Sequence, residues 1–160
     1  MIRFLISFIF LFFLSCSYNS STEHRDKRTG TISIRFDEND LQEMAKKISS
    51  KILYSSLDFS KIYSFGNIRN DTFDHMDTKK LNSKIVTILL KSKKVTIVKD
   101  SHQANAIFFG KISSIFKKNH HLKDMFFSFN LTLSDAKTAD ILWSEDIEIQ
   151  KIYKKKLFSW

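Results

Sequence analysis

The chain has 160 residues, of which 42% are hydrophobic and 27% are charged, and its formal net charge is +9. This length predicts one domain, and the charged fraction argues against a bundle of helices embedded in a membrane. The absence of proline and the presence of only three glycines argue against a propeller or a barrel of many hairpins, which place these residues at their corners.

The first 15 residues have the three parts of a secretory signal peptide. Arg3 supplies the positive charge, and the apolar run 4–14 (FLISFIFLFFL) follows it. A helix of this run would be about 16 Å long at about 1.5 Å per residue, whereas a bilayer core is about 30 Å thick. Residues 1–15 are therefore predicted to be a signal peptide, and secretion argues against nucleic acid as a partner of this basic chain.

The residue that follows, Cys16, is the only cysteine of the chain. The run Phe13-Leu14-Ser15-Cys16 resembles the bacterial lipobox, in which the cysteine becomes the first mature residue and carries lipid. Several acyl chains would anchor the protein stably at a membrane. The alternatives are an ordinary signal peptide with an incidental cysteine and an uncleaved anchor. A disulfide framework is not expected, because it needs paired cysteines.

Residues 16–31 are polar and show no apolar periodicity, so we expect a flexible tether before a single domain at residues 32–160. The domain is predicted to begin with a short extended segment at residues 32–36. Apolar side chains then recur at helical spacing, which predicts an amphipathic helix over residues 40–54. Its apolar face holds Leu41, Met44, Ala45, Ile48 and Ile52.

The middle of the chain predicts a strand, a helix and a strand. The strand spans residues 61–69 and is expected to end at the loop residues 70–72. Asp77 or Thr78 caps a second helix, whose apolar face is formed by Leu81, Ile85, Ile88 and Leu89. Residues 95–98 (VTIV) are β-branched and predict a strand.

Three further strands are predicted over residues 106–116, 125–133 and 141–152, joined by a polar loop at 117–124 and a turn at 134–140. We expect their aromatic side chains to lie in the core: Phe108, Phe109, Phe116, Phe126, Phe127 and Phe129. The element order favours an α+β (α/β) fold, a two-layer sandwich in which a mixed four- to five-stranded sheet carries two helices on one face.

Signals for catalysis or metal binding are weak. The sequence has no glycine-rich phosphate loop and no nucleophile elbow, and its five histidines lack the spacing of metal ligands. Asp71, Asp74 and Asp77 precede the second helix, where cap and turn roles explain them more simply than paired catalytic carboxylates. The sequence therefore predicts neither an enzyme nor a bound metal or cofactor.

Two clusters of basic residues are candidates for contact with an acidic partner or with phospholipid headgroups. The first lies around the predicted loop at 117–124 and holds Lys117, Lys118, His120, His121 and Lys123. The second lies at the C-terminus and holds Lys151, Lys154, Lys155 and Lys156 beside Tyr153, Phe158 and Trp160. The alternative for these clusters is a solvated strand edge or loop and a loose tail.

Several motifs occur in a fixed order along residues 38–152. They are a helix with Asp40-Leu41 and Met44-Ala45, the segment 64–98 with its Asn70-Asp71-Thr72 loop, the run Ala104-Asn105-Ala106-Ile107 with Gly110, and the run 133–143 (LSDAKTADILW). Together they resemble the LpoB family, outer-membrane lipoproteins that activate bifunctional penicillin-binding proteins. Ala139 stands where the family pattern has glycine, and the stretch 98–104 is short where many members carry a further helix.

The resemblance implies a non-enzymatic protein held by lipid at Cys16 on the periplasmic face of the outer membrane, with the inner membrane as the alternative. It implies that the domain binds and activates a class A penicillin-binding protein, which is a peptidoglycan synthase. LptE-like lipopolysaccharide-assembly lipoproteins share part of the pattern. An assembly role in lipopolysaccharide transport or in a flagellar or secretion complex is therefore the alternative function. The helix at 40–54 and the loop at 70–72 favour the LpoB resemblance.

Overall fold

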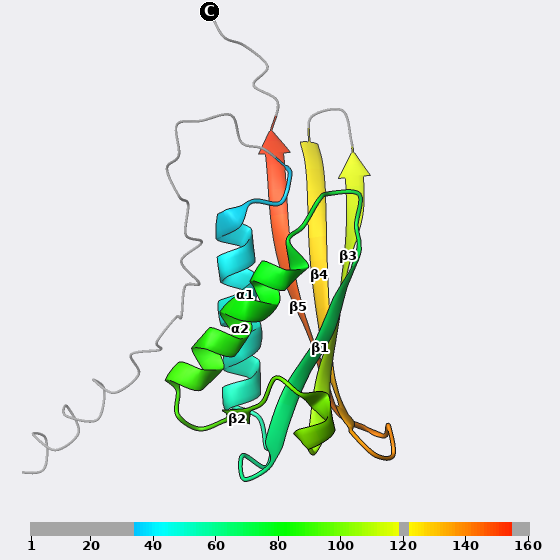
Figure 1. The fold of residues 1–160 in the computed structure, drawn as a ribbon. Coiled ribbons are helices and arrows are strands. Elements are labelled where there is room, and N and C mark those ends of the chain that lie inside the picture. Colours follow the sequence, from blue (N-terminus) through cyan, green and yellow to red (C-terminus); the bar gives the residue numbers. More distant parts are fainter. Residues whose placement is uncertain (1–33, 119–121, 155–160) are drawn as a thin grey trace, which may run out of the picture. The chain divides into compact units, whose positions relative to one another are not determined.

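A computed structural model describes residues 34–118 and 122–154, which lie in a compact unit, Thr31–Trp160. Two helices lie on one face of a five-stranded mixed sheet (Figure 1), which confirms the predicted α+β two-layer sandwich. The elements are α1 (Glu38–Leu53), β1 (Ile62–Asp71), α2 (Thr78–Lys91), β2 (Thr96–Ile97), the 3-10 turn η2 (Ser101–Gln103), β3 (Ala106–Lys118), β4 (Leu122–Asp135) and β5 (Ile141–Lys154).

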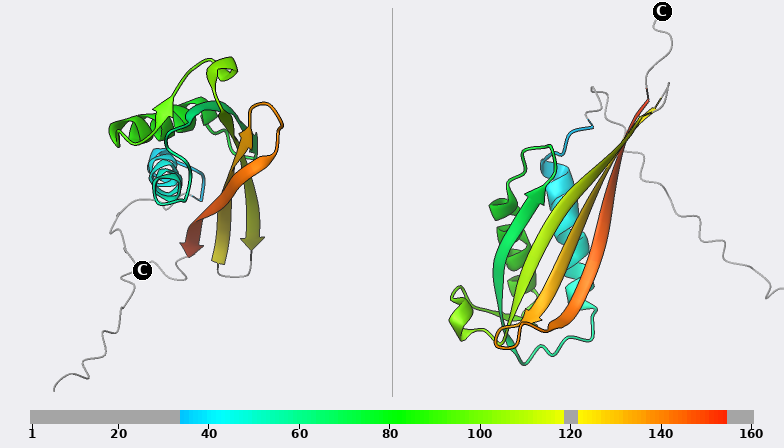
Figure 2. Two further views of the ribbon diagram at one scale, coloured as in Figure 1. Left: turned by 90° about the horizontal axis from the view of Figure 1, so that it is seen from below. Right: turned by 90° about the vertical axis from the view of Figure 1, so that its right-hand side faces the viewer.

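The sheet has the strand order β2-β1-β3-β4-β5. β1 is parallel to both β2 and β3, because the chain returns through α2 and η2 before each of these strands. β3, β4 and β5 form two successive antiparallel hairpins, and β5 is an edge strand. Figure 2 shows that both helices lie on the same side of the sheet, so the other face carries no described helix.

Helix α1 begins two residues before the predicted position because its first turn is capped by side chains. Asp37 Oδ1 accepts hydrogen bonds from the N–H groups of Asn39, at 2.8 Å, and Asp40, at 3.2 Å. Asp40 Oδ2 accepts one from the N–H of Asp37, at 2.7 Å. This reciprocal capping box satisfies donors that a helix start otherwise leaves unpaired. Asp77, one of the two predicted caps, caps α2 by accepting from Lys80 N at 2.9 Å, and Thr78 is the first residue of the helix.

The core lies between the helices and the sheet. The predicted apolar face of α1 is entirely buried, and Leu81, Ile85 and Leu89 of α2 are buried with it, while Ile88 is half-buried. The large side chains that β3 and β4 bury in this core are Phe108, Ile112, Phe127, Phe129, Leu131 and Leu133. Burial of each large apolar side chain contributes about 1.5–3 kcal/mol to the free energy of folding, so this layer contact stabilises the fold.

Two of the six phenylalanines predicted to be buried are exposed instead. Phe109 on the uncovered sheet face is 46% exposed, and Phe116 near the end of β3 is 49% exposed. Phe126 is half-buried. The prediction was wrong for Phe109 and Phe116. An aromatic residue favours a strand, but it does not indicate which face of the sheet the helices cover.

Several element boundaries differ from the prediction. β3 continues to Lys118 and β4 begins at Leu122, so the predicted loop at 117–124 is strand at both of its ends, because the two strands stay paired there. Residues 34–36 of the predicted extended segment join no strand; Arg35 O accepts a hydrogen bond from Lys151 Nζ and Phe36 N donates one to Asp74 Oδ2. β1 continues through Asp71, because Asn70 and Asp71 still pair with β3, so the predicted break at residue 70 was wrong. The remainder of the predicted extended segment, residues 32 and 33, lies outside the described residues.

Within the part of the chain that the structure describes, no helix is both long enough and apolar enough to cross a membrane.

Candidate interaction surface

The first cluster of basic candidates lies where β3, β4 and β5 extend past the rest of the sheet (Figures 1 and 2). β1 pairs with β3 only as far as Asp71 opposite Ser113, so no described strand pairs with the last part of β3 on that side. β3 and β4 stay paired to Lys118 opposite Lys123. We call this surface the hairpin end, and its described residues are 115–118, 123–126 and 150–152.

The hairpin end exposes apolar side chains on both faces of the sheet. Ile115 is 61% exposed, Phe116 is 49% exposed and Ile152 is 39% exposed. Ile115 and Phe116 are consecutive on a strand, so their side chains point to opposite faces. Both stay accessible because β1 no longer flanks β3 at this level. Exposed apolar groups surrounded by charges are typical of surfaces that contact another molecule.

Lysines surround these apolar groups. Lys117 Nζ lies 5.0 Å from the ring centroid of Phe126, a cation–π contact across the two strands. Lys118 is directly opposite Lys123, so three lysines lie close together on two neighbouring strands. The hairpin end therefore combines exposed apolar area with a local excess of positive charge, which favours a negatively charged partner.

The structure thus brings Lys117, Lys118 and Lys123 together, as neighbouring residues of one hairpin. His120 and His121 lie outside the described residues, and so does Cys16. Most of the C-terminal candidates also lie outside the described residues. These are Lys155, Lys156, Phe158 and Trp160, together with the side chains of Tyr153 and Lys154. The expectation for these residues therefore stays a prediction.

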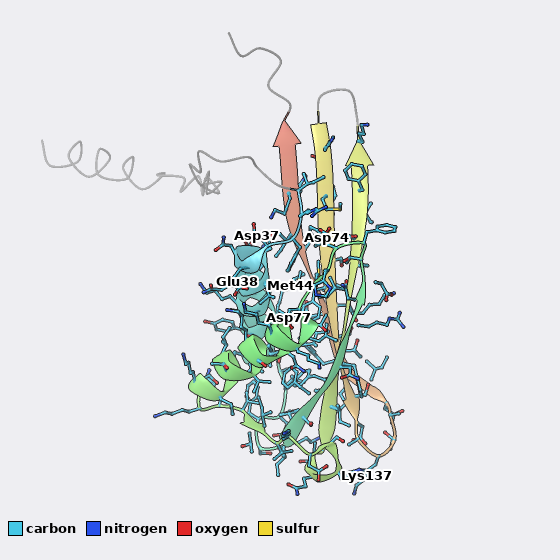
Figure 3. The ribbon with its side chains drawn as sticks, turned by 45° about the horizontal axis from the view of Figure 1, so that its top comes forward. Asp37, Glu38, Met44, Asp74, Asp77 and Lys137 are labelled. Atoms are coloured by element: carbon cyan, nitrogen blue, oxygen red, sulfur yellow. The ribbon has the colours of Figure 1, made fainter. Side chains whose placement is uncertain are left out.

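Lys151 departs from the expected basic end, because its side chain faces α1 and is only 11% exposed. Its Nζ donates to Arg35 O at 2.8 Å, to Asp37 Oδ2 at 3.0 Å and to Asp40 Oδ2 at 2.5 Å. The lysine therefore joins β5 to the first turn of α1. The labels Asp37 and Glu38 mark this turn in Figure 3. Sequence spacing could not indicate this contact, since the partners are more than a hundred residues apart.

The two carboxyl groups on Lys151 have pKa values shifted in opposite directions. Burial raises the pKa of Asp40 above its usual value, and the hydrogen bond from Lys151 only partly offsets this. Burial alone would also raise the pKa of Asp37. Hydrogen bonds from Lys151 and from the N–H groups of Asp40 and Asn39 outweigh that effect and hold its pKa below the usual value.

The three aspartates before α2 have separate structural roles. The pKa of Asp71 is lowered by a hydrogen bond from Arg69, and Lys111 Nζ also lies 3.5 Å from its carboxylate. Asp74 accepts from Phe36 N at 3.0 Å, and Asp77 caps α2 (Figure 3). Only Asp77 therefore has the expected cap role, whereas the Asp71 carboxylate pairs with Arg69 and Lys111 and the Asp74 carboxylate holds the segment before α1. Among the described residues, no group of three or more His, Cys, Asp or Glu side chains is placed to hold a metal ion.

The last residues of β1 and the turn that follows, residues 70–74, are held by their own side chains. Asn70 Nδ2 donates to Asp74 O at 2.9 Å, and Asn70 Oδ1 accepts from Thr72 N at 3.0 Å. Thr72 Oγ1 accepts from Asp74 N at 3.2 Å. These bonds replace backbone pairing where β1 leaves the sheet, which explains why asparagine and threonine occupy this part of the predicted motif.

One family model matches the chain, that of the peptidoglycan-synthase activator LpoB, over residues 38–108. The match begins with α1 and ends within β3. No sequence among the curated proteins matches the chain.

Solved structures share the fold at low identity. The LpoB C-terminal domain from Escherichia coli is 13% identical, with 69% of this chain and 98% of that domain covered and a TM-score of 0.50. The same domain from Salmonella enterica is 12% identical, with coverages of 68% and 94% and a TM-score of 0.45. A PelC dodecamer from Paraburkholderia phytofirmans is 15% identical, with coverages of 60% and 76% and a TM-score of 0.45.

Proposed function

Because the chain belongs to the LpoB family, which residues 38–108 match, we propose that it is a lipid-anchored activator of a peptidoglycan synthase. The synthase is a class A penicillin-binding protein, and the chain acts on it by binding, without catalysing a reaction itself. Lipid at Cys16 holds the protein on the periplasmic face of the outer membrane. The family match is the observation that carries this proposal.

An activator of this kind works through a difference in affinity. It raises synthase activity only if it binds the active conformation of the enzyme more tightly than the inactive one. A tenfold preference corresponds to about 1.4 kcal/mol, which a small interface can supply. The protein needs no catalytic group for this, and its function is then determined by the surface that contacts the synthase.

We place the contact with the synthase at the hairpin end. Its exposed Ile115 and Phe116 offer apolar area, while Lys117, Lys118 and Lys123 favour an acidic surface on the enzyme. His120 and His121, which join the two strands in sequence, belong to the same proposed contact. The proposal is supported by the free edge of β3 at this level.

The first experiment is crosslinking in whole cells with a tagged full chain that keeps Cys16, followed by identification of the captured proteins. We expect a class A penicillin-binding protein, and we expect the full chain to increase its rate of peptidoglycan synthesis. A Cys16→Ala chain should lack the acyl chains, so we expect less of it at the outer membrane and less captured synthase. Capture of an outer-membrane barrel or of a motor component, with no synthase, would contradict the proposed function.

The proposed contact surface is tested by a matched pair of charge reversals. Lys117→Glu lies at the hairpin end, whereas Lys137→Glu lies at the other end of β4, after Asp135 (Figure 3). Both lysines are exposed, so neither change should unfold the domain. We expect Lys117→Glu to weaken activation of the synthase and Lys137→Glu to leave it unchanged. Equal activation by both variants would mean that the hairpin end does not contact the synthase.

A further inference from the structure

A second surface, separate from the hairpin end, lies between the two helices. α1 and α2 border an open groove of about 730 Å³ that is lined by residues of these two helices alone. We call it the helix groove. Its lysines are Lys46, Lys80, Lys84 and Lys91, its apolar members are Ala45 and Ile88, and the remaining lining residues are serine, threonine and glutamine.

The helix groove is strongly basic. Four lysines line it and no acidic residue does. The excess of positive charge extends beyond the groove, because residues 78–94 hold six lysines and no aspartate or glutamate. Lys80 and Lys84 share one counter-charge, Glu38, at 2.6 and 3.1 Å. Within the described ranges, Lys46 and Lys91 form no ion pair. A negatively charged occupant would therefore be attracted here.

The arrangement of the groove favours a helical occupant. Lys80, Lys84 and Lys91 follow one another at helical spacing, so they line one side over about 16 Å at about 1.5 Å per residue. Ile88 is half-buried and Ala45 is buried, so apolar atoms lie deeper than the lysine ammonium groups. An amphipathic helix can place apolar side chains between two helices and carboxylates against the lysines. A flat lipid surface reaches the lysines but not the apolar atoms.

The occupant does not come from this chain. Residues 17–33 hold Glu23 and Asp26, but they also hold three basic residues, Arg25, Lys27 and Arg28. Residues 155–160 hold two lysines and no acidic residue. Neither segment carries the negative charge that the groove requires, so like-charge repulsion disfavours both.

We propose that the helix groove docks an acidic amphipathic helix of another periplasmic protein. The lysines pair with carboxylates on the two flanks of that helix, and the half-buried Ile88 contacts its apolar stripe. The contact differs from the proposed synthase contact in position and in partner chemistry, and it does not depend on the identity of the synthase. Because the ion pairs lie at the surface, the binding should weaken as salt is added.

The test measures binding of a synthetic peptide to the full chain in a non-ionic detergent, by fluorescence anisotropy. The probe is a labelled amphipathic helix about 14 residues long, with leucines on one face and glutamates flanking them. A second peptide carries glutamine in place of each glutamate. We expect saturable binding of the glutamate peptide that weakens with added salt, and binding of the glutamine peptide that is at least about tenfold weaker.

Two double variants with the same change in charge locate the site. Lys46→Glu with Lys91→Glu changes the groove, and Lys79→Glu with Lys94→Glu changes exposed lysines that do not line it. We expect the groove variant to bind the peptide about tenfold more weakly and the other variant to bind it as the unchanged chain does. The midpoint of thermal unfolding, measured for both, shows whether each variant is folded.

Three results would overturn the proposal. Equal weakening by both variants would mean that net charge alone attracts the peptide. Binding of phosphatidylglycerol vesicles, with no saturable binding of the peptide, would identify the basic helix layer as a lipid-binding surface. A dimer in sedimentation velocity that dissociates only in the groove variant would mean that a second copy of this chain occupies the groove.

Discussion

Ala139 has a backbone conformation that glycine adopts more easily. Its φ is 63°, in the left-handed region that crowds the Cβ atom of an L-residue. The turn imposes this conformation, because Asp135 Oδ1 accepts from the N–H groups of Lys137 and Thr138, at 2.8 and 3.0 Å. Ala139 N in turn donates to Asp135 O at 3.1 Å. The family pattern noted in the sequence has glycine at this position, and the conformation explains that preference.

Ala139→Gly should therefore stabilise the domain. Relief of the left-handed strain gains about 1–2 kcal/mol, and the greater freedom of glycine in the unfolded chain costs about 0.4–1 kcal/mol. We expect a net increase of about 0.5–1 kcal/mol in the free energy of unfolding, measured by urea denaturation. Ala136→Gly, in the same turn but without a positive φ, should lower it instead. The explanation fails if both changes destabilise equally.

Two glycines of the sheet differ in what surrounds them. A Cβ atom added at Gly110 would lie 2.7 Å from Phe129 Cε2 and 2.9 Å from Ile68 Cγ1, and both side chains are buried. A Cβ atom at Gly66 would lie 2.6 Å from Phe109 Cε1. That ring is 46% exposed and can turn away into solvent. The shortest contacts are similar at the two positions, but only the exposed Phe109 ring beside Gly66 can move aside without disturbing the core.

Gly110→Ala should consequently destabilise the domain by about 1–3 kcal/mol, the usual cost of excess volume in a packed core. Gly66→Ala should lower the free energy of unfolding by less than about 1 kcal/mol, because moving an exposed ring costs little. Chemical denaturation of the two variants in parallel measures the difference. A larger loss at Gly66 would show that the β1 bulge at this glycine, rather than the space around it, limits substitution.

At the scale of elements, Lys151 connects the end of β5 with the start of α1. The helix depends on Asp37 and Asp40 for its cap, and the same two carboxylates accept hydrogen bonds from Lys151. The ammonium group and Asp40 are each about nine-tenths buried, so both charges are largely withdrawn from water. A buried ion pair of this kind costs much when one partner is removed, because the other charge stays buried alone.

Lys151→Met keeps the length of the side chain and removes its charge. We expect the free energy of unfolding to fall by about 3 kcal/mol, since Asp37 and Asp40 then repel each other without a cation between them. The matched change Lys118→Met, at an exposed lysine of the hairpin end, should alter it by less than about 0.5 kcal/mol. Equal thermal unfolding midpoints for the two variants would refute a stabilising role for this ion pair.

At the scale of the whole molecule, hydrogen-bonded carboxylates make stability depend on pH. Five groups among residues 34–118 and 122–154 have a lowered pKa, because lysine, arginine, hydroxyl or backbone N–H donors stabilise the charged form: Asp37, Glu38, Asp58, Asp71 and Asp135. Each contributes stability above its unfolded pKa of about 4 and loses it as the pH falls through its folded value. Asp40, whose pKa is raised by burial, acts in the opposite direction.

We therefore expect the thermal unfolding midpoint to be lower at pH 3 than at pH 7, within a window that starts near pH 4. Protonation of the acidic groups also leaves the excess positive charge of the chain unbalanced, which adds repulsion in the compact state. Circular dichroism melting curves at several pH values measure the effect. An unchanged or rising midpoint on acidification would mean that the stability gained by protonating buried Asp40 outweighs the stability lost at the five other groups.

The order and type of the helices and longer strands followed from sequence alone. Apolar residues at helical spacing determined which face of α1 is buried, and Asp77 marked the start of α2. Alternation in residues 125–133 determined that Phe127 and Phe129 face the core. These predictions succeeded because local spacing and the burial of one face impose the same pattern on neighbouring residues.

The tertiary structure alone decided which groups meet across the chain. It buried Lys151 against α1, left Phe109 and Phe116 accessible, and aligned the lysines of two helices along one groove. Each outcome depends on where one element ends relative to another: β1 stops opposite Ser113, and α1 starts beside the end of β5. Local sequence specifies how a segment folds, whereas exposure and charge pairing depend on distant segments that pack against it.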